Sequence, residues 1–131
     1  MKVLIEITGG LLIALALLHA AFPRRFRWRE ETAGLSLLTR QILYVHTFFI
    51  ALTVFLIGLL CVTSADGLIH TGLGRRVSMG LAAFWGIRLA IQFVGYSPEL
   101  WRGRTFETTM HVLFSLFWAF LTLLFLRISL G

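Results

Sequence analysis

The sequence predicts an all-α integral membrane protein, with a single transmembrane domain over residues 1–131 that folds as an up-down-up-down four-helix bundle. Three observations support this prediction. Hydrophobic residues make up 58% of the chain and charged residues 14%, whereas a soluble domain carries about 25% charged residues. Four apolar runs approach the roughly 20 helical residues that cross a bilayer. The connections between these runs are short, so consecutive helices should run antiparallel.

The four apolar runs are expected to be helices, because a helix satisfies its backbone hydrogen bonds within one spanning segment. The first run resembles a signal peptide, since Lys2 precedes it and Ala14-Leu15-Ala16 looks like a cleavage site. We interpret it as a retained helix, because it is long enough to span and is followed by several arginines that resist translocation. The four helices are expected at about residues 3–22, 41–62, 77–94 and 109–128.

The net charge of +6 is located mainly between the apolar runs. In a soluble protein such a charge would point to nucleic acid as a partner. Short basic segments that flank apolar runs favour anionic lipid head groups instead, and no nucleic-acid partner is expected. The side chains expected to contact these lipids are Arg24, Arg25, Arg27 and Arg29.

The distribution of Lys and Arg also predicts how the chain is oriented. The connections at residues 23–40 and 95–108 hold seven of them, against four on the other side of the membrane. Connections rich in Lys and Arg tend to stay in the cytoplasm. The first and third connections should therefore be cytoplasmic, with both termini outside.

Five polar side chains within the expected spans are the candidate functional residues. Such residues are costly in hydrocarbon, with about 2.5–3.5 kcal/mol for an arginine at the helix centre on insertion scales. In the antiparallel arrangement, all five fall in the same half of the membrane, which predicts that they meet. The five residues are His19, His46, Arg88, Gln92 and His111.

Helical spacing gives two of the expected helices a polar and aromatic stripe that should face the bundle interior. One stripe comprises Trp85, Arg88, Gln92 and Tyr96, and the other His111, Ser115, Trp118 and Thr122.

Several ligands fit this set of side chains. The three imidazoles of His19, His46 and His111 match a tetrahedral metal site with one open position. Two of them could instead be the axial ligands of a b-type haem. Arg88 suits an anion or a quinone carbonyl, because its planar guanidinium makes paired contacts with oxygens. The alternative is structural, with each histidine bonded to a backbone carbonyl and Arg88 locking two helices together or extending toward the interface.

No catalytic residues are predicted. The chain lacks a Cys-x-x-Cys pair, a His-Glu-x-x-His helix and a phosphate-binding glycine loop, and no serine or cysteine lies in a recognisable nucleophile context. An enzyme is therefore disfavoured, although the sequence does not exclude one.

Two segments resemble a group of small bacterial four-helix membrane proteins that have no assigned activity. These segments are Leu38–His46 and Phe84–Phe93, with Trp101-Arg102 further along the chain. The resemblance implies a four-helix topology in a bacterial inner membrane. It also implies that His46, Arg88 and Gln92 matter together.

Three functions remain open at this point. The first is a non-enzymatic accessory subunit of a larger membrane complex, which would need a membrane-protein partner or a second copy of the chain. The second is a redox or ligand-binding module that holds a haem, a metal ion or a quinone through the candidate residues. The third is a small oligomeric transporter or channel, which would need more than one copy, because four helices enclose little space.

Overall fold

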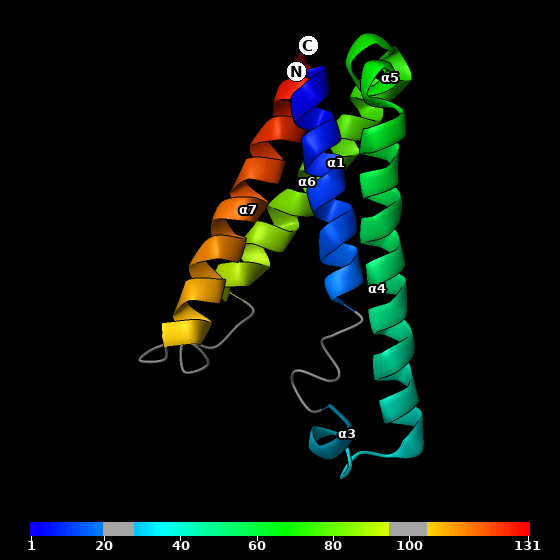
Figure 1. The fold of residues 1–131 in the computed structure, drawn as a ribbon, viewed down its shortest axis with the longest axis vertical. Helices are drawn as coiled ribbons and strands as arrows, with labels where there is room; N and C mark the ends of the chain where they lie inside the picture. The colour runs from blue at the N-terminus through cyan, green and yellow to red at the C-terminus, as the bar shows by residue number, and fades with distance from the viewer. Residues whose placement is uncertain (20–27, 95–104) are drawn as a thin grey trace. The chain divides into compact units, whose positions relative to one another are not determined.

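The computed structural model describes residues 1–19, 28–94 and 105–131 (Figure 1). Helix accounts for 91% of these residues, and no strand occurs among them. The prediction of an all-α fold is therefore confirmed for the part of the chain described. The helices are α1 (Lys2–Leu18), α3 (Trp28–Glu31), α4 (Leu37–Thr63), α5 (Ala65–His70), α6 (Gly72–Val94) and α7 (Thr105–Leu130).

The chain divides into two compact units, Met1–Ala65 and Asp66–Gly131. In the first unit α1 packs along α4, and in the second α6 packs along α7. Within each unit the two long helices run in opposite directions (Figure 1). Each unit is thus an antiparallel helical hairpin, as the short connections predict.

Three described helices are long and apolar enough to cross a membrane, namely α4, α6 and α7. Helix α1 has 17 described residues, which is about 26 Å of helix at 1.5 Å per residue. The residues that would complete the predicted span of 3–22 lie outside the described ranges. A membrane protein is therefore supported, whereas the count of four spans stays a prediction.

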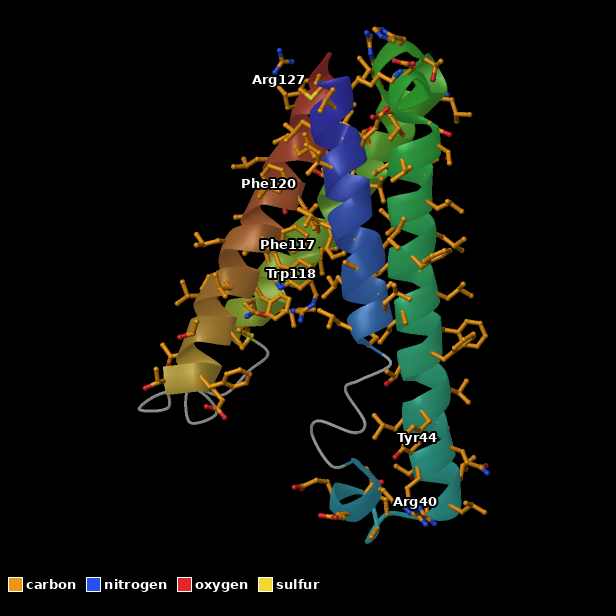
Figure 2. The ribbon with its side chains drawn as sticks, in the orientation of Figure 1. Arg40, Tyr44, Phe117, Trp118, Phe120 and Arg127 are labelled. Atoms are coloured by element: carbon orange, nitrogen blue, oxygen red, sulfur yellow. The ribbon has the colours of Figure 1, made fainter. Side chains whose placement is uncertain are left out.

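Large apolar side chains are exposed along these helices (Figure 2). On α4, for example, Phe48, Phe49 and Ile50 are 62%, 55% and 54% exposed. Monomeric proteins in water rarely leave contiguous apolar surface of this kind uncovered. Lipid covers such a surface without cost, which agrees with the composition.

Close contact between two glycines holds the first hairpin together. In the first unit, Gly9 and Gly58 bring α1 and α4 so close that a Cβ atom on Gly9 would lie 2.6 Å from the Gly58 carbonyl oxygen. Small residues allow this approach, and the close backbone contact replaces the hydrophobic force that is missing between helices in lipid. The predicted role of glycine is thus found at Gly9 and Gly58, whereas Gly10 and Gly80 have open space.

Three of the long helices begin earlier than predicted. Helix α4 begins at Leu37 because Ser36 caps it, its Oγ accepting a hydrogen bond from the Thr39 backbone N–H at 3.1 Å. Helix α6 begins at Gly72 and so includes Arg75 and Arg76, which were expected in a connection. Helix α7 begins at Thr105, with Glu107 in its first turn.

The connections also contain short helices. Helix α3 lies in the first and α5 in the second, and neither was predicted. Close contact of Gly74 with Gly67 brings the start of α6 against α5.

Candidate functional site

Three of the five candidate residues meet in the second unit, between α6 and α7. Arg88 and Gln92 are one turn apart on α6, and the Arg88 Nη1 donates a hydrogen bond to the Gln92 Oε1 at 3.3 Å. Gln92 is 5% exposed, and its Nε2 lies 3.3 Å from both the His111 Nδ1 and the His111 carbonyl oxygen on α7. The amide of Gln92 therefore bridges the two helices.

His111 is held from several sides. An Nδ1 that accepts from Gln92 leaves the ring proton on Nε2. The edge of the Phe93 ring meets the imidazole at a centroid distance of 5.8 Å and an angle of 85°. One turn further along α7, the Ser115 hydroxyl donates to the His111 carbonyl at 2.6 Å. The contacts with Gln92 and Phe93 orient the ring against α6.

A stack of two tryptophans lies next to this network. Trp85 on α6 and Trp118 on α7 are parallel within 8°, with ring centroids 5.1 Å apart, and Figure 2 shows Trp118 in its place on α7. The Arg88 guanidinium carbon lies 5.1 Å from the centroid of the Trp118 ring, which is within the range of a cation–π contact. Phe114 also stacks on Trp118, at 5.6 Å.

The two stripes predicted on these helices thus face each other. They come together through Trp85, Arg88 and Gln92 on one side and through His111 and Trp118 on the other. Tyr96 lies outside the described residues. Thr122, further along the second stripe, donates to its own helix at the Trp118 carbonyl.

Both stacked tryptophans carry an unsatisfied polar group. Trp85 and Trp118 are 2% and 5% exposed. In the part of the chain that the structure describes, neither indole Nε1 has a hydrogen-bond partner. A buried indole N–H usually finds an acceptor, and an unpaired one in a native structure needs an explanation, such as an ordered water, an ion or a functional role.

The chemistry of the cluster is that of a donor-rich site. Arg88 supplies a permanent positive charge with several N–H donors, and the two indoles supply one N–H donor each. None of Arg88, Gln92, His111, Trp85 and Trp118 carries a negative charge. Such a set matches a ligand that presents acceptor oxygens beside a flat or apolar body.

The other two candidates, His19 and His46, lie in the first unit. Each ring nitrogen Nδ1 is 2.9 Å from a carbonyl oxygen one turn back, that of Leu15 for His19 and that of Ile42 for His46. Such a contact agrees with the structural alternative for these histidines, and their place in a binding site stays a prediction. His46 is also exposed, on the outer surface of its hairpin.

Metal coordination by His19, His46 and His111 stays a prediction. These residues belong to two different units. Across residues 1–19, 28–94 and 105–131, no group of three or more His, Cys, Asp or Glu side chains is placed to hold a metal ion. The b-type haem hypothesis, which needs two of the same histidines, likewise stays a prediction.

Sequence reasoning did not identify a second polar location, between α3 and the start of α4. Its main residue is Arg40, which we placed in a connection and counted only as a charge. The spacing of Arg40 and Tyr44 by four residues, directly after a Ser36 cap, was the available signal that both lie on one face of a helix.

Comparison with known proteins yields no relative. No family model, no curated protein and no solved structure matches the chain. The functional argument therefore depends on the geometry of the chain itself.

Proposed function

We propose that the chain is a non-catalytic ligand-binding module of a bacterial inner membrane, and that its ligand is a quinone or a closely similar membrane-soluble carbonyl compound. The observation that carries this proposal is the pair of buried indole N–H groups of Trp85 and Trp118, which lack an acceptor beside the Arg88 charge.

A quinone fits the chemistry of this cluster in three respects. Its carbonyl oxygens accept hydrogen bonds from N–H groups, which Arg88 and the two indoles supply. Its flat ring is suited to packing beside an aromatic cluster such as that of Trp85, Trp118 and Phe114. Its apolar tail dissolves among lipid chains and the exposed apolar side chains of α6 and α7, for example Ile87 and Leu116.

The membrane placement is part of the same proposal. We propose four spans, with α1 as the additional one beside α4, α6 and α7. The close contact of Gly9 with Gly58, which packs α1 along a spanning helix, supports this count. We retain the orientation with both termini outside, which the positions of Lys and Arg support.

A titration of a short-chain ubiquinone analogue into the protein in lipid nanodiscs tests the ligand. Quenching of tryptophan fluorescence reports binding. The Arg88→Met variant should bind at least tenfold more weakly, because a hydrogen bond to a charged group contributes about 1.5–3 kcal/mol and about 1.4 kcal/mol corresponds to tenfold in affinity.

Arg76→Met is the matched control. Arg76 lies on the same helix and is exposed, so its loss should change the affinity by less than twofold. Equal affinities of wild type and Arg88→Met, or no saturable quenching in the wild type, would contradict the proposal.

An absorption spectrum and a metal analysis of the same purified sample test the two other cofactors. A Soret band that is lost in His46→Ala would show that the ligand is haem and not a quinone. Stoichiometric metal that is lost in His111→Ala would show that it is a metal ion. The accessory-subunit and transporter functions remain predictions, because no contact in either hairpin favours them.

A further inference from the structure

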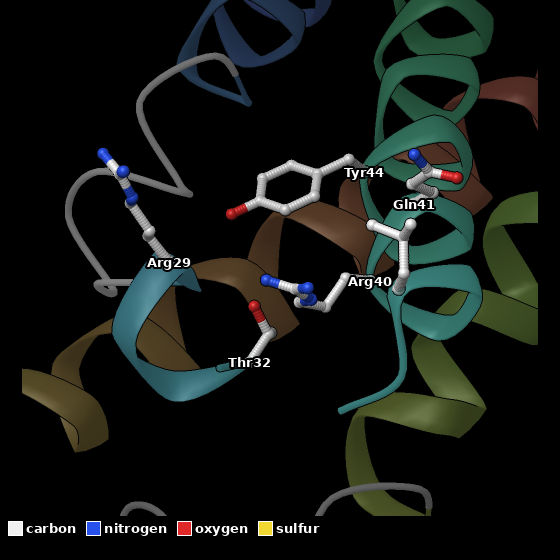
Figure 3. A pocket seen from close by; sticks show the side chains of 6 residues that line it. Arg29, Thr32, Arg40, Gln41 and Tyr44 are labelled. Atoms are coloured by element: carbon white, nitrogen blue, oxygen red, sulfur yellow. The ribbon is translucent and has the colours of Figure 1, made fainter. Parts of the chain in front are cut away.

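A separate cavity, open to the surface and lined by both polar and apolar side chains, lies in the first unit between the short helix α3 and the start of α4 (Figure 3). Its volume is about 190 Å³. At about 30 Å³ per water molecule in the liquid, this space corresponds to roughly six waters. The lining residues are Arg29, Thr32, Leu37, Arg40, Gln41 and Tyr44.

Several side chains around this cavity carry groups that can donate hydrogen bonds. The Arg40 guanidinium and the Tyr44 phenol extend from α4 toward α3, and the Thr32 hydroxyl points toward Arg40 (Figure 3). Thr32 is 6% exposed. The Nε of Arg40 is buried, and no hydrogen-bond partner for it exists within the described residues. A buried guanidinium N–H without an acceptor is costly, so the cavity lacks an acceptor at this position.

The charge of the cavity is positive. Arg29 and Arg40 both line it, whereas the acidic residues of the same region, Glu30 and Glu31, are exposed and do not. In Figure 3 the Arg40 guanidinium lies near the Tyr44 and Thr32 hydroxyls, whereas the Arg29 guanidinium extends away from Arg40. A guanidinium with hydroxyl groups beside it is suited to phosphate oxygens.

The position of the cavity at the start of α4 favours a lipid head group as the source of the phosphate. The cavity lies within the first two turns of α4, a helix that is long and apolar enough to span. Tyrosine and arginine at this position of a span lie at the depth of the head groups. Next to the cavity, Leu37, Leu38 and Ile42 are 62%, 68% and 45% exposed, which offers an apolar surface to acyl chains.

We infer that the cavity between α3 and α4 is a binding site for the phosphate of an anionic phospholipid, with Arg40 as the charged contact. This site differs from the general attraction expected of Arg24, Arg25, Arg27 and Arg29, because it has a defined volume and a defined donor set. The inference depends on the membrane placement in the proposed function, and it is independent of the quinone site.

The test is a titration of a short-chain phosphatidylglycerol into the full-length protein in a neutral detergent, followed by microscale thermophoresis. The Arg40→Gln variant should bind at least tenfold more weakly than the wild type. Arg76→Gln, which removes an exposed arginine from the other unit, should bind within twofold of the wild type. Equal weakening by both variants would mean that net charge alone governs binding, and would overturn the inference.

Two further measurements complete the test. Arg40→Lys keeps the charge but loses the Nε donor, so it should be several-fold weaker than the wild type even if Arg40→Gln fails to fold; wild-type affinity in Arg40→Lys would overturn the role of Nε. Glycerol phosphate, which has no acyl chains, should bind at least tenfold more weakly than the lipid. Equal affinity for glycerol phosphate would assign the cavity to a soluble phosphate ester.

The two sites can be distinguished with the same proteins. Arg40→Gln should leave the affinity for the ubiquinone analogue unchanged, and Arg88→Met should leave the affinity for phosphatidylglycerol unchanged. If the wild type binds phosphatidylglycerol but does not bind the ubiquinone analogue, the proposed ligand of α6 and α7 is refuted while the lipid site stands.

Discussion

Replacement of Gly9 by alanine should separate α1 from α4, whereas the same replacement at Gly10 should leave the hairpin intact. A Cβ atom on Gly9 would lie 2.6 Å from the Gly58 carbonyl oxygen and 2.9 Å from the Cys61 Cβ, whereas a Cβ atom on Gly10 meets no atom within 4 Å. A backbone oxygen cannot rotate away as a side chain can. The two helices must therefore move apart, with an expected loss of about 3 kcal/mol, the upper end of the usual range for overpacking.

Comparison of Gly9→Ala with Gly10→Ala cancels the effect of helix propensity. Alanine favours a helix over glycine by about 1 kcal/mol, and this gain is common to both variants, because both positions lie within α1. The difference between Gly9→Ala and Gly10→Ala therefore isolates the contact with α4.

Cys61 makes the separation measurable. It is the single cysteine of the chain, and it is 0% exposed, next to Gly9. Reaction with a maleimide requires opening of the hairpin, so its rate follows the population of the open form. The rate should increase at least tenfold in Gly9→Ala and less than twofold in Gly10→Ala. Equal rates in the two variants would show that α1 does not depend on this glycine contact.

Replacement of Gln92 by methionine should weaken the second hairpin and disturb the candidate site together. Methionine has a similar length but cannot bridge Arg88 and His111, which Gln92 now joins through contacts of 3.3 Å. Hydrogen bonds between helices in membranes contribute about 0.6 kcal/mol each on average. Loss of the set, with Arg88 deprived of a partner, should cost about 2 kcal/mol.

Ile91→Met is the control for this change. Ile91 is adjacent in sequence and 46% exposed, so the same methionine there should change the stability by less than about 0.5 kcal/mol. Unfolding of both variants by increasing SDS in mixed micelles, followed by circular dichroism, gives the two free energies. If Gln92→Met unfolds at the same SDS fraction as Ile91→Met, the amide of Gln92 does not hold α6 to α7.

The helical character of the chain could be predicted because it follows from hydropathy and run length. Four apolar runs indicated the long helices, and α4, α6 and α7 all contain their predicted cores. The first residue of each helix was less predictable, because a helix can begin with polar turns that precede its apolar run. Arg75 and Arg76 are helical for this reason, and Ser36 moves the start of α4 by its capping hydroxyl.

The candidate site was partly predictable. Spacing alone placed Arg88 and Gln92 on one face and His111 with Trp118 on another, and these faces meet. The partner of each side chain could not be predicted, because it depends on the rotation and offset of α6 against α7. The stacking of Trp85 on Trp118 and the bridging role of Gln92 are results of that offset.

Residue type and expected depth also do not predict which partner a histidine finds. His19 and His46 matched His111 in type and in expected depth, yet each bonds to a carbonyl of its own helix. That preference arises from the local rotamer, which hydropathy does not encode. The cavity at Arg40 was missed for a similar reason, since α3 has only four residues and no apolar pattern.

The most direct test of the central claim is the indole region of a ¹⁵N–¹H correlation spectrum, recorded on protein labelled at tryptophan and embedded in nanodiscs. The chain has four tryptophans, so four indole signals can be assigned by single Trp→Phe variants. On addition of the ubiquinone analogue, the signals of Trp85 and Trp118 should move downfield as their N–H groups gain an acceptor. Unmoved signals of Trp85 and Trp118 at saturating ligand would contradict the account.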